Sequence, residues 1–430
     1  MNILSLYEWV TTLLGPVIKL FLLRRKKAGK EHPTRYRERR GYASRARPDG
    51  HLIWLHAASV GEAMSSLALI DKLLASDPAL HVLQTTGTVS SAAIMENKLP
   101  DRAIHQFVPV DRPKWVARFI NHWRPDLSIW LESELWPNLI TQTAKTGSPL
   151  VLINGRMSEK SFQQWKHLPG LSAKLLGSFD LCMGQSGKDS ARFETLGAPL
   201  VISPGNLKLA AQPLGFDESN LALLREELNE RPIWLAASTH AGEDKLVAEA
   251  HLALRKKYPN LLTIIAPRHP NRADRIEDEL TSMGLKLQRR STSSAQKIDI
   301  TCDVYLADTL GELGLFYRLS DIIFLGGTLG ANVGGHNPVE PAQLDCAIIR
   351  GPDMTNFATF AKALDEVQGC IIVDEAISLS SELDKLLSQP KELAKQIAAS
   401  KRFADEGSAV LDHIMRALLP FLQFNKNSSD

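Results

Sequence analysis

The 430-residue chain is poor in cysteine, and its four cysteines lie far apart at positions 182, 302, 346 and 370. Disulfide frameworks and structural zinc sites are recognised by paired or closely spaced cysteines, and neither spacing is present here. Three of the four lie in or beside apolar runs, which is typical of buried free thiols in a reducing compartment. The sequence therefore predicts neither a disulfide-linked fold nor a zinc site.

Several motifs of common catalytic sites are also missing. The chain has no Gly-x-Gly-x-x-Gly fingerprint and no P-loop, which argues against a dinucleotide cofactor and against ATP hydrolysis. It has no Gly-x-Ser-x-Gly nucleophile elbow. Without an Asp-x-Asp pair or a cluster of His, Cys and carboxylate residues, no bound divalent metal and no cofactor are expected.

Charge is nearly balanced overall but unevenly distributed. The formal net charge is only +2, yet residues 24–47 hold eleven Lys and Arg against two acids. An apolar run at residues 3–23 precedes this basic collar and contains Glu8, Lys19 and a Gly15-Pro16 break. The basic flank favours the cytoplasmic side, and no cleavage site for a removed signal peptide is visible. The run predicts either one short membrane span or an interfacial helix on anionic lipid, whereas nucleic acid is the weaker rival.

Strands alternate with helices along the rest of the chain, which is typical of parallel sheets covered on both faces. A chain of this length also predicts more than one domain. We expect a membrane anchor at 1–47, a Rossmann-like domain at 48–211, a linker at 212–230, a second Rossmann-like domain with C-terminal helices at 231–424, and a disordered tail at 425–430. Two such domains suggest a cleft between them. The expected strands are 51–56, 81–86, 105–108, 127–131, 150–153 and 181–184 in the first domain, and 232–237, 261–266, 304–307, 322–325, 347–349 and 371–373 in the second.

One glycine-rich stretch, residues 326–342, stands out because it follows an apolar strand and contains five glycines within ten residues. Glycines let the backbone approach a ligand closely. Asn337, Pro338 and Glu340 then have the spacing of a helix N-cap, a first-turn proline and a capping box. Strand, glycine loop and helix N-terminus together predict a phosphate or nucleotide site, although a capped loop without ligand is the alternative.

Polar residues also follow other strands. Glu62 lies three residues after Ser59, so it is either a capping-box residue or a functional carboxylate. Glu132 and Glu134 stand beside Trp136 at a strand end, where burial would be costly for structure alone. Further loops carry Lys208, the Ser-Thr-His segment at 238–240, the Pro-Arg-His-Pro segment at 267–270 and the Thr-Leu-Gly-Glu-Leu segment at 309–313.

Taken in order, these motifs resemble the 3-deoxy-D-manno-octulosonic acid (Kdo) transferases of Gram-negative bacteria. The resemblance runs from the N-terminal anchor to the last helix. Its motifs are His-Ala-Ala-Ser-Val-Gly-Glu at 56–62, Glu-Ser-Glu-Leu-Trp-Pro-Asn at 132–138, Asn-Gly-Arg-Met-Ser at 154–158, Gly-Asn-Leu-Lys at 205–208, Pro-Arg-His-Pro at 267–270, Asp-Thr-Leu-Gly-Glu at 308–312 and Gly-Gly-His-Asn-Pro-Val-Glu-Pro at 334–341.

The resemblance implies a GT-B glycosyltransferase with two Rossmann-like domains facing a central cleft. It implies transfer of Kdo from CMP-Kdo to the tetraacylated lipid A precursor, with inversion and release of cytidine monophosphate (CMP). By analogy, Glu62 is the general base, and Glu132 and Lys208 stabilise the transition state. The residues implied to bind CMP are Pro267, Arg268, Gly311, Glu312, Leu313, Asn337, Pro338, Val339 and Glu340.

The same resemblance implies a location at the cytoplasmic leaflet of the inner membrane, with a single N-terminal signal-anchor and no nucleic-acid partner. A metal-free reaction agrees with the residues, because Arg268 and a helix N-terminus can stabilise a single-phosphate leaving group. Two rivals remain at this stage. A GT-B nucleotide-sugar epimerase would share the second half but needs no lipid, and a non-catalytic membrane scaffold would explain residues 3–47 but not the polar loops.

Overall fold

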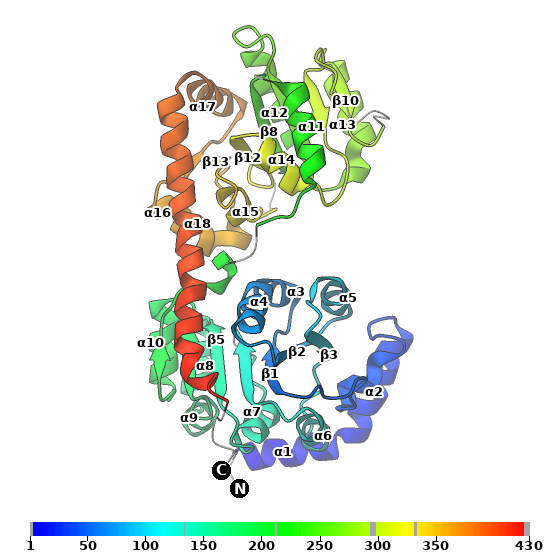
Figure 1. Ribbon diagram of the computed structural model, residues 1–430, viewed down its shortest axis with the longest axis vertical. Helices are drawn as coiled ribbons and strands as arrows, with labels where there is room; N and C mark the ends of the chain where they lie inside the picture. The colour runs from blue at the N-terminus through cyan, green and yellow to red at the C-terminus, as the bar shows by residue number, and fades with distance from the viewer. Residues whose placement is uncertain are drawn as a thin grey trace. The chain divides into compact units, whose positions relative to one another are not determined.

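The computed structural model describes residues 3–132, 134–210, 213–229, 231–292, 298–330 and 333–424. The chain divides into two compact units, Met1–Gln212 with Gly407–Asp430, and Pro213–Glu406 (Figure 1). Each unit contains one seven-stranded sheet, and every strand pairing in both sheets is parallel. The two parallel α/β domains expected from the sequence are therefore present, whereas the expected tail at 425–430 lies outside the described residues.

The first unit has the strand order β3-β2-β1-β4-β5-β6-β7, so the order reverses between β1 and β4. Its strands are β1 (His51–His56), β2 (Leu80–Thr86), β3 (Ala103–Phe107), β4 (Leu127–Leu131), β5 (Leu150–Gly155), β6 (Leu181–Gly184) and β7 (Val201–Ile202). Its helices are α1 (Ile3–Leu13), α2 (Gly15–Lys27), η1 (Arg35–Arg40), α3 (Val60–Ser65), α4 (Leu67–Ser76), α5 (Val89–Lys98), α6 (Pro113–Trp123), α7 (Pro137–Ala144), α8 (Glu159–Lys166), α9 (Pro169–Leu176), α10 (Gly187–Thr195) and η2 (Leu207–Ala210).

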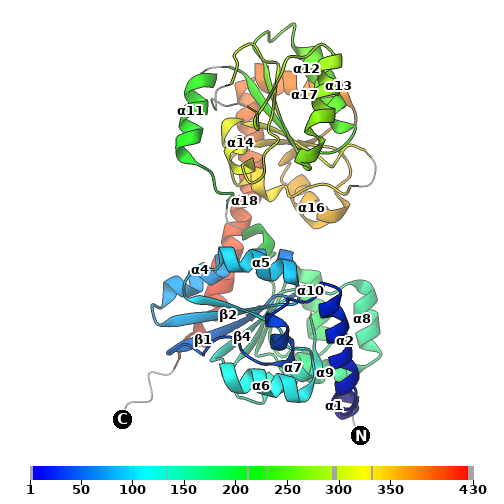
Figure 2. The ribbon, with the colours of Figure 1, turned by 90° about the vertical axis from the view of Figure 1, so that its right-hand side faces the viewer.

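Apolar cores lie on both faces of this sheet. Figure 2 shows α4 and α5 on one face and α6 and α7 on the other. Leu69 and Leu73 of α4 pack in one core, whereas Val116 and Phe119 of α6 pack in the other. The strands are buried on both faces, which explains why they read in the sequence as continuous apolar runs without alternation.

The second unit repeats the pattern with the order β10-β11-β9-β8-β12-β13-β14, which reverses between β8 and β12. Its strands are β8 (Ile233–Thr239), β9 (Leu262–Pro267), β10 (Leu287–Arg289), β11 (Val304–Leu306), β12 (Ile322–Leu325), β13 (Ala347–Arg350) and β14 (Cys370–Ile372). Its helices are α11 (Glu218–Leu228), α12 (Glu243–Leu254), η3 (Pro270–Arg272), α13 (Ala273–Ser282), α14 (Leu313–Leu319), α15 (Val339–Ala342), η4 (Thr355–Phe357), α16 (Ala358–Glu366) and α17 (Ala376–Ser388), followed by α18 (Pro390–Leu418) and η5 (Leu419–Phe421).

The structure differs from the expected elements in a few places. The strands β7 and β10 were missed because each is very short and only partly buried. The segment after β1 forms two helices, α3 and α4, which meet at Ser66. The Ser66 hydroxyl donates to the Ala63 carbonyl and accepts from the Gln84 amide. The stretch expected as a linker contains α11, which packs three leucines into the core of the second unit.

The expected boundary at residue 424 was also wrong, because the chain from Gly407 onward belongs to the first unit. The last turns of α18 place Val410, Leu411, Ile414 and Leu418 in the core that also contains α4. A Cβ atom on Gly407 would lie 2.2 Å from the Leu209 carbonyl oxygen, so only glycine permits this close approach. The part of α18 from Gly407 onward is thus a structural part of the N-terminal unit.

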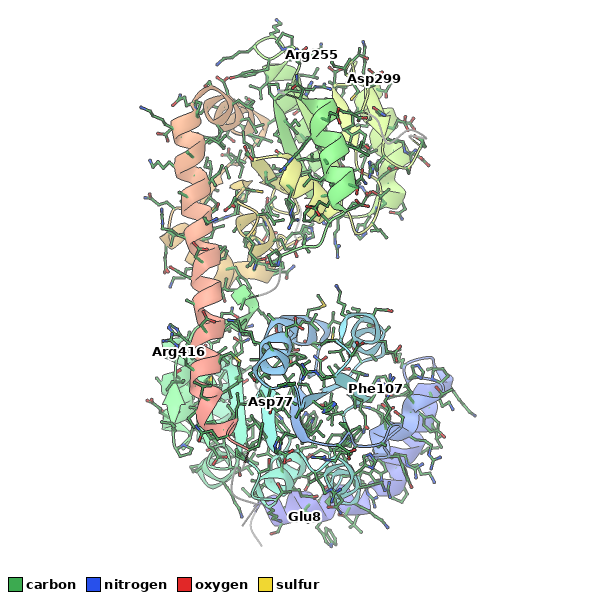
Figure 3. All side chains as sticks on the ribbon, viewed as in Figure 1. Glu8, Asp77, Phe107, Arg255, Asp299 and Arg416 are labelled. Carbon is green, nitrogen blue, oxygen red and sulfur yellow. The ribbon has the colours of Figure 1, made fainter. Side chains whose placement is uncertain are left out.

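The N-terminal apolar run forms two helices instead of the expected single anchor helix. The helices α1 and α2 are bent by 59° at their break, and no single described helix is long and apolar enough to cross a membrane, although the bent pair passes that test. On one side, the Tyr7 hydroxyl donates to Asp111 at 3.0 Å and Leu4 packs on the core. On the other side Trp9 and Phe21 are 59% and 57% exposed. Glu8, which lies on α1 beside Trp9, is exposed as well (Figure 3).

The basic collar is partly neutralised inside the first unit. Glu38 is buried and accepts two hydrogen bonds from the Arg35 guanidinium and one from the backbone N–H of Phe107, at the end of β3 (Figure 3). Glu31 is also buried and pairs with Arg25 at 2.6 Å. The collar therefore serves the fold as well, and its exposed cations include Arg24, Lys27, Lys30, Arg37 and Arg45.

The role of α18 in the first unit is tested by replacing Ile414 with Ala. Ile414 is fully buried, and truncating such a side chain costs about 2–5 kcal/mol through lost burial and a residual cavity. We expect denaturant unfolding of the full-length variant to show a loss in this range. The matched control is His413→Ala, because His413 is exposed on the same turn of α18. Equal stability of the two variants would contradict the assignment of this turn to the core.

Candidate functional site

Glu62 lies in the loop-helix segment that follows the central strand β1, and it is buried. The Ser59 hydroxyl oxygen caps α3 by accepting the Glu62 backbone N–H at 3.3 Å. The carboxylate accepts the Ala58 N–H and the Ser59 hydroxyl, each at 2.8 Å. The expected capping box is therefore incomplete, because Glu62 bonds to the N–H of Ala58 and not to that of Ser59. Its side chain is fixed at the carboxyl edge of the sheet.

Burial raises the pKa of Glu62. The nearby charges of Glu132 and Glu134 act in the same direction, whereas the two hydrogen bonds act against it. A buried carboxylate with a raised pKa at a strand end is the type of group that serves as a general base. The alternative reading of Glu62, as a purely structural cap, explains neither its burial nor the acidic groups around it.

Glu132 and Lys208 form an ion pair beside this carboxylate. Glu132 follows the neighbouring strand β4, has φ of 58°, and lies 2.5 Å from the Lys208 ammonium through its Oε1. A positive φ at a non-glycine residue is strained and is held only by its surroundings. Here the Glu132 N–H donates to the Ile153 carbonyl at 3.0 Å. The structure therefore brings Glu62, Glu132 and Lys208 close together, three residues to which the family resemblance assigns catalytic roles.

The Lys208 turn, η2, is held from two directions. The Asn154 side-chain oxygen, from the end of β5, accepts the Leu207 N–H at 2.9 Å. Asn154 is itself buried with φ of 56°. Gly205 has φ of 112°, and a Cβ atom there would lie 2.6 Å from the Val410 side chain of α18. Asn154 thus positions the lysine turn, a role that the sequence motif did not indicate.

In the second unit, the buried carboxylate of Glu243 organises the glycine loop. Its Oε2 accepts the N–H groups of Gly327 and His240 at 2.7 and 2.8 Å. Its Oε1 accepts those of Thr328 and Leu329 at 3.0 and 2.9 Å. Four N–H donors on two oxygens are the geometry of an ionised carboxylate. Although the sequence predicted an external anion at these loop amides, the side chain of Glu243 occupies them.

A bulge at the end of β8 brings the two segments together. The register of β8 against β9 shifts between Ala237 and Thr239, and Ser238 has φ of 58°. Gly326 must be glycine at this point, because a Cβ atom there would lie 2.7 Å from the Ser238 carbonyl oxygen. The bulge turns His240 toward the glycine loop, where its Nε2 lies 2.9 Å from the Nε2 of His336.

The expected capping box at Asn337 is also altered. The helix α15 begins at Val339 and contains only four residues, with Pro338 at the N-cap position. The Asn337 side-chain oxygen accepts the Val339 N–H at 3.1 Å, and its amide donates to the Glu340 Oε1 at 3.2 Å. Asn337 and Glu340 therefore order the turn together, and α15 is too short to act as a helix dipole of the expected kind.

Arg268, the two histidines and Glu340 meet at the carboxyl edge of the second sheet. Arg268 follows β9, its N–H donates to the Thr239 carbonyl at 3.0 Å, and its side chain is exposed. Its charge lowers the pKa values of His240 and His336 after the larger effect of burial. Burial raises the pKa of Glu340, and Arg268 opposes this shift. The group combines cationic and hydrogen-bonding side chains suited to an anionic ligand.

The loop that carries Gly311, Glu312 and Leu313 follows β11 at the same edge. Both carboxylate oxygens of Glu312 bind the Arg290 guanidinium, at 2.7 and 3.2 Å. Asp308 similarly pairs with Arg289 at 2.9 Å. Arg289, at the end of β10, and Arg290 therefore anchor this loop. The side chain of Glu312 is thus engaged internally, while Gly311 is exposed.

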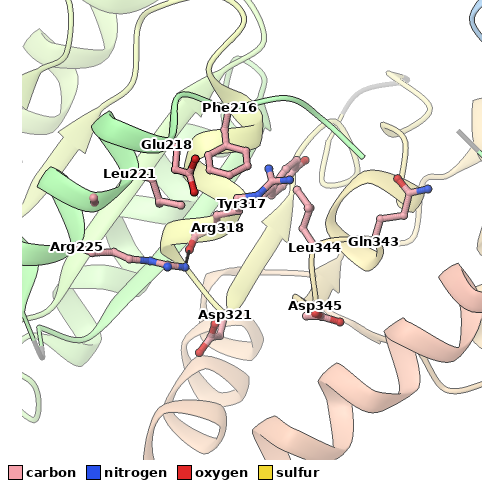
Figure 4. Close-up of a pocket in the computed structure, with 11 residues that line it drawn as sticks. Phe216, Glu218, Leu221, Arg225, Tyr317, Arg318, Asp321, Gln343, Leu344 and Asp345 are labelled. Atoms are coloured by element: carbon pink, nitrogen blue, oxygen red, sulfur yellow. Dashed lines mark hydrogen bonds between the residues drawn. The ribbon is translucent and has the colours of Figure 1, made fainter. Parts of the chain in front are cut away.

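A pocket of about 590 Å³ lies away from these residues. Asp321 and Asp345 line it and precede β12 and β13, so it lies at the amino ends of the strands. Arg225 donates to the Arg318 carbonyl oxygen at 2.9 Å within it (Figure 4). None of the predicted site residues lines this pocket. Among the described residues, no group of three or more His, Cys, Asp or Glu could hold a metal ion.

Comparisons of the sequence with known proteins show the family of this chain. Residues 34–211 match the family model described as 3-deoxy-D-manno-octulosonic-acid transferase (kdotransferase). The 3-deoxy-D-manno-octulosonic acid transferase of Rickettsia bellii is 34% identical over 420 residues, which cover 97% of this chain and 99% of that protein. The resemblance noted in the motifs therefore extends over the whole length of the chain.

Solved structures with low identity show the same fold. A glycosyltransferase from Rickettsia africae matches with a TM-score of 0.55 at 11% identity, over 88% of this chain and 100% of that one. The UDP-GlcNAc 2-epimerase from Neisseria meningitidis matches with a TM-score of 0.55 at 13% identity, over 86% and 100%. These likenesses confirm the GT-B fold class but do not separate transferase from epimerase, whereas the full-length relative does.

The organising role of Glu243 is tested by Glu243→Gln. An amide can keep two of the four N–H bonds, but its NH2 group would face the other two donors. We expect a loss of about 1.5–3 kcal/mol in the free energy of unfolding, with faster hydrogen exchange at the amides of residues 327–329. Glu249→Gln, a half-buried residue of the same helix α12 that contacts only Lys245 among the described charged groups, is the control. Unchanged exchange at the three loop amides in Glu243→Gln would refute this role.

Proposed function

The chain belongs to the 3-deoxy-D-manno-octulosonic acid transferase family, and from this membership we propose that it transfers Kdo from CMP-Kdo to the tetraacylated lipid A precursor, with inversion at the anomeric carbon and release of CMP. The full-length likeness to the Rickettsia bellii transferase is the observation that carries the proposal. As a Kdo transferase, the protein is a glycosyltransferase. The donor, the acceptor and the stereochemistry are the parts proposed here.

Glu62 is the proposed general base. The acceptor hydroxyl gives its proton to the Glu62 carboxylate while its oxygen forms a bond to the anomeric carbon of Kdo. The bond from that carbon to the phosphate oxygen breaks, and its electron pair leaves with CMP. The fixed orientation of the carboxylate and its raised pKa support this role, because a base is most effective when its pKa lies nearer the working pH.

Glu132 and Lys208 are proposed to stabilise charge in the transition state. Their ion pair at 2.5 Å places the Lys208 ammonium among the acids around Glu62. Glu62 must be ionised to act as a base, and a nearby cation favours that form. Preorganised charges of this kind stabilise developing charge without reorganisation during the reaction. The strained backbone at Glu132 and the Asn154 contact to the lysine turn support a precisely held pair.

The second unit is proposed to bind the CMP part of the donor. Pro267, Arg268, the loop 311–313 and the turn 337–340 all follow strands at the same edge of the parallel sheet, where such sheets bind ligands. Arg268 is exposed and pairs with no acid in the described part of the chain, so it is available to a phosphate. We propose that these protein groups stabilise the leaving phosphate without a bound metal ion.

The bent pair α1–α2 is proposed to attach the protein to the cytoplasmic leaflet of the inner membrane. Its inner side is bonded to the first unit, and its outer side exposes apolar residues next to exposed basic ones. This arrangement favours an interfacial position over a span, because a spanning helix could not keep the Tyr7–Asp111 contact. An acyl-chain acceptor would lie in the same surface.

The proposed base is tested by Glu62→Gln, assayed with CMP-Kdo and lipid acceptor in the presence of EDTA. Gln can still accept the Ala58 N–H but cannot take a proton. We expect turnover to fall about 10²–10⁴-fold with little change in thermal stability or CMP affinity. Turnover near that of the wild type would move the base to Glu132 or Glu134. Loss of wild-type activity in EDTA, restored by magnesium, would contradict the proposal that the reaction needs no bound metal ion.

Ser59→Ala is the matched control for that variant. It removes the N-cap and should cost about 1 kcal/mol of stability, with far less loss of turnover than Glu62→Gln. It also removes a hydrogen bond that stabilises the ionised Glu62 carboxylate and so should raise its pKa further. The acid limb of the rate profile should therefore move to higher pH. A shift to lower pH would contradict this account of the site.

The proposed phosphate contact is tested by Arg268→Ala. Loss of a hydrogen bond to a charged group should weaken CMP binding by about 1.5–3 kcal/mol in calorimetry. The matched control is Arg275→Ala, because Arg275 is exposed on the adjacent helix α13. A folded Arg268→Ala protein that binds CMP as tightly as the control would remove Arg268 from the nucleotide site.

Membrane attachment is tested by replacing Trp9, Val17 and Phe21 with Glu together. All three are more than half exposed, so folding should be retained. Sedimentation with phosphatidylglycerol–phosphatidylethanolamine vesicles should show binding weakened at least about 100-fold, since each large apolar side chain contributes about 1.5–3 kcal/mol. Leu223→Glu is the control, because Leu223 is 48% exposed on α11 in the second unit. Equal sedimentation of the two variants would exclude this surface.

A further inference from the structure

One buried carboxylate that the proposed mechanism does not use joins the N-terminal helix α1 to the start of α7. The helix α1 lies beside α6 and α7 in the first unit (Figure 1). Asp111, in the segment between β3 and α6, is 6% exposed. Its Oδ2 accepts the Tyr7 hydroxyl of α1 at 3.0 Å and the Asn138 N–H of α7 at 3.1 Å. Its Oδ1 accepts the Leu139 N–H at 2.7 Å, so one side chain binds both helices.

The start of α7 depends on Asp111 because the helix has no cap of its own. The first N–H groups of a helix have no partner inside the helix, and the residue before it commonly supplies one. Here that residue is Trp136, whose side chain makes no capping hydrogen bond, and the first helical residue is Pro137, which has no N–H. Asp111 binds the next two N–H groups and so takes the place of an N-cap residue.

Two further contacts hold α1 in the same place. The Asn138 side-chain amide donates to the Thr11 hydroxyl oxygen of α1 at 3.2 Å. Arg112, the residue after Asp111, donates to the Thr12 carbonyl near the end of α1 at 3.3 Å. Its guanidinium lies against the break between α1 and α2, where a Cβ atom on Gly15 would come within 2.5 Å of it. The bend of the helix pair is therefore fitted to the residues that hold α7.

The loop between β4 and α7 carries acids of the proposed catalytic site. It begins at Glu132, whose N–H donates to the Ile153 carbonyl at 3.0 Å, and it ends at Trp136. The Trp136 N–H donates to the Glu134 carbonyl at 3.1 Å, and the Trp136 indole N–H donates to the Glu134 carboxylate. One end of this loop is thus fixed by β5 and the other by the start of α7. A shift of α7 would move the loop and its acids.

The helix α1 has two different faces. Leu4, Tyr7 and Thr11 are spaced by three and four residues and contact the first unit. The opposite face carries four exposed apolar residues at the same helical spacing, which are Leu6, Trp9, Val10 and Leu13. None of the 11 residues of α1 is buried, and a helix of this length is marginal by itself in water. A lipid surface that covers the exposed face would stabilise α1 and leave its contacts with the first unit intact.

We propose that Asp111 is a positioning residue that couples the attachment of α1 to lipid with the position of the loop that carries Glu132. The inference rests on the proposed membrane attachment and on the proposed role of Glu132, and it adds a dependence of turnover on lipid binding. Lipid on the outer face keeps α1 docked, the docked helix keeps the Tyr7 hydroxyl on Asp111, and Asp111 holds the start of α7. Two distant sites are coupled when both act on one shared element, which here is α7.

Hydrogen exchange of the full-length protein tests the coupling directly. Exchange at the amides of Asn138 and Leu139 is measured with and without phosphatidylglycerol–phosphatidylethanolamine vesicles that contain no acceptor. We expect the vesicles to slow exchange at these two amides at least about tenfold, the factor that corresponds to a hydrogen bond to a charged group. The triple variant with Glu at Trp9, Val17 and Phe21 should show no vesicle effect, because its outer face no longer favours lipid.

The decisive variant is Tyr7→Phe, which removes the hydroxyl that joins α1 to Asp111 and leaves the exposed face of α1 unchanged. It should bind vesicles and CMP like the wild type but lose the vesicle effect on exchange. Its kcat on acceptor embedded in vesicles should fall about tenfold at an unchanged KM for CMP-Kdo, because misplaced catalytic groups slow the reaction without weakening donor binding. Tyr258→Phe is the matched control, since it removes a 2.7 Å hydrogen bond from a half-buried tyrosine to Asp384 in the second unit. It should keep both kcat and the vesicle effect.

A wild-type protein that binds the vesicles without slower exchange at the two amides would overturn the inference and leave the membrane attachment in place. The same holds for a Tyr7→Phe protein with the kcat of the wild type, or for a vesicle effect that persists in the triple variant. A wild-type protein that does not bind the vesicles would overturn the membrane attachment and the inference together.

Discussion

The second unit depends on one buried carboxylate. Glu243 accepts four backbone N–H groups, three from the glycine loop and one from His240, and so connects the loops after β8 and β12. Neighbouring loops at the switch point of a parallel sheet have no backbone pairing of their own, and unpaired buried N–H groups are costly. The carboxylate satisfies these groups and so fixes the loops that carry His240 and His336 at the carboxyl edge of the sheet.

The two units use the same topological position for different chemistry. In the first, Glu62 and Glu132 follow the central neighbours β1 and β4, and in the second His240 and the glycine loop follow β8 and β12. Each pair of strands lies where the strand order reverses, so that the loops on either side turn away from each other. The first unit places acids and a lysine there, which suits proton removal from a hydroxyl. The second places cationic and imidazole groups there, which suits an anion.

Buried strands could be predicted from the sequence because both of their faces are covered, so β1, β4, β6 and β12 read as mostly apolar runs with the bounds that were expected. The short edge strand β10 could not, because an edge position needs only partial burial and tolerates polar residues. The break at Ser66 depends on a hydrogen bond from Gln84, and the docking of Ile414 in the first unit depends on contacts more than 200 residues away in the chain. Local patterns carry no information about either.

The sequence by itself determined the family, the two parallel sheets and the identity of the charged residues at the strand ends, because motif order and hydrophobic runs are properties of the chain alone. Only the tertiary structure decided how those residues are engaged. In the folded chain, the amides of the glycine loop donate to Glu243 and the Glu312 carboxylate binds Arg290. The Nε2 atoms of His240 and His336 contact each other. Each of these contacts joins segments that lie far apart in the sequence or in different loops, and such partners are chosen by three-dimensional proximity, which the spacing of residues along a chain does not encode.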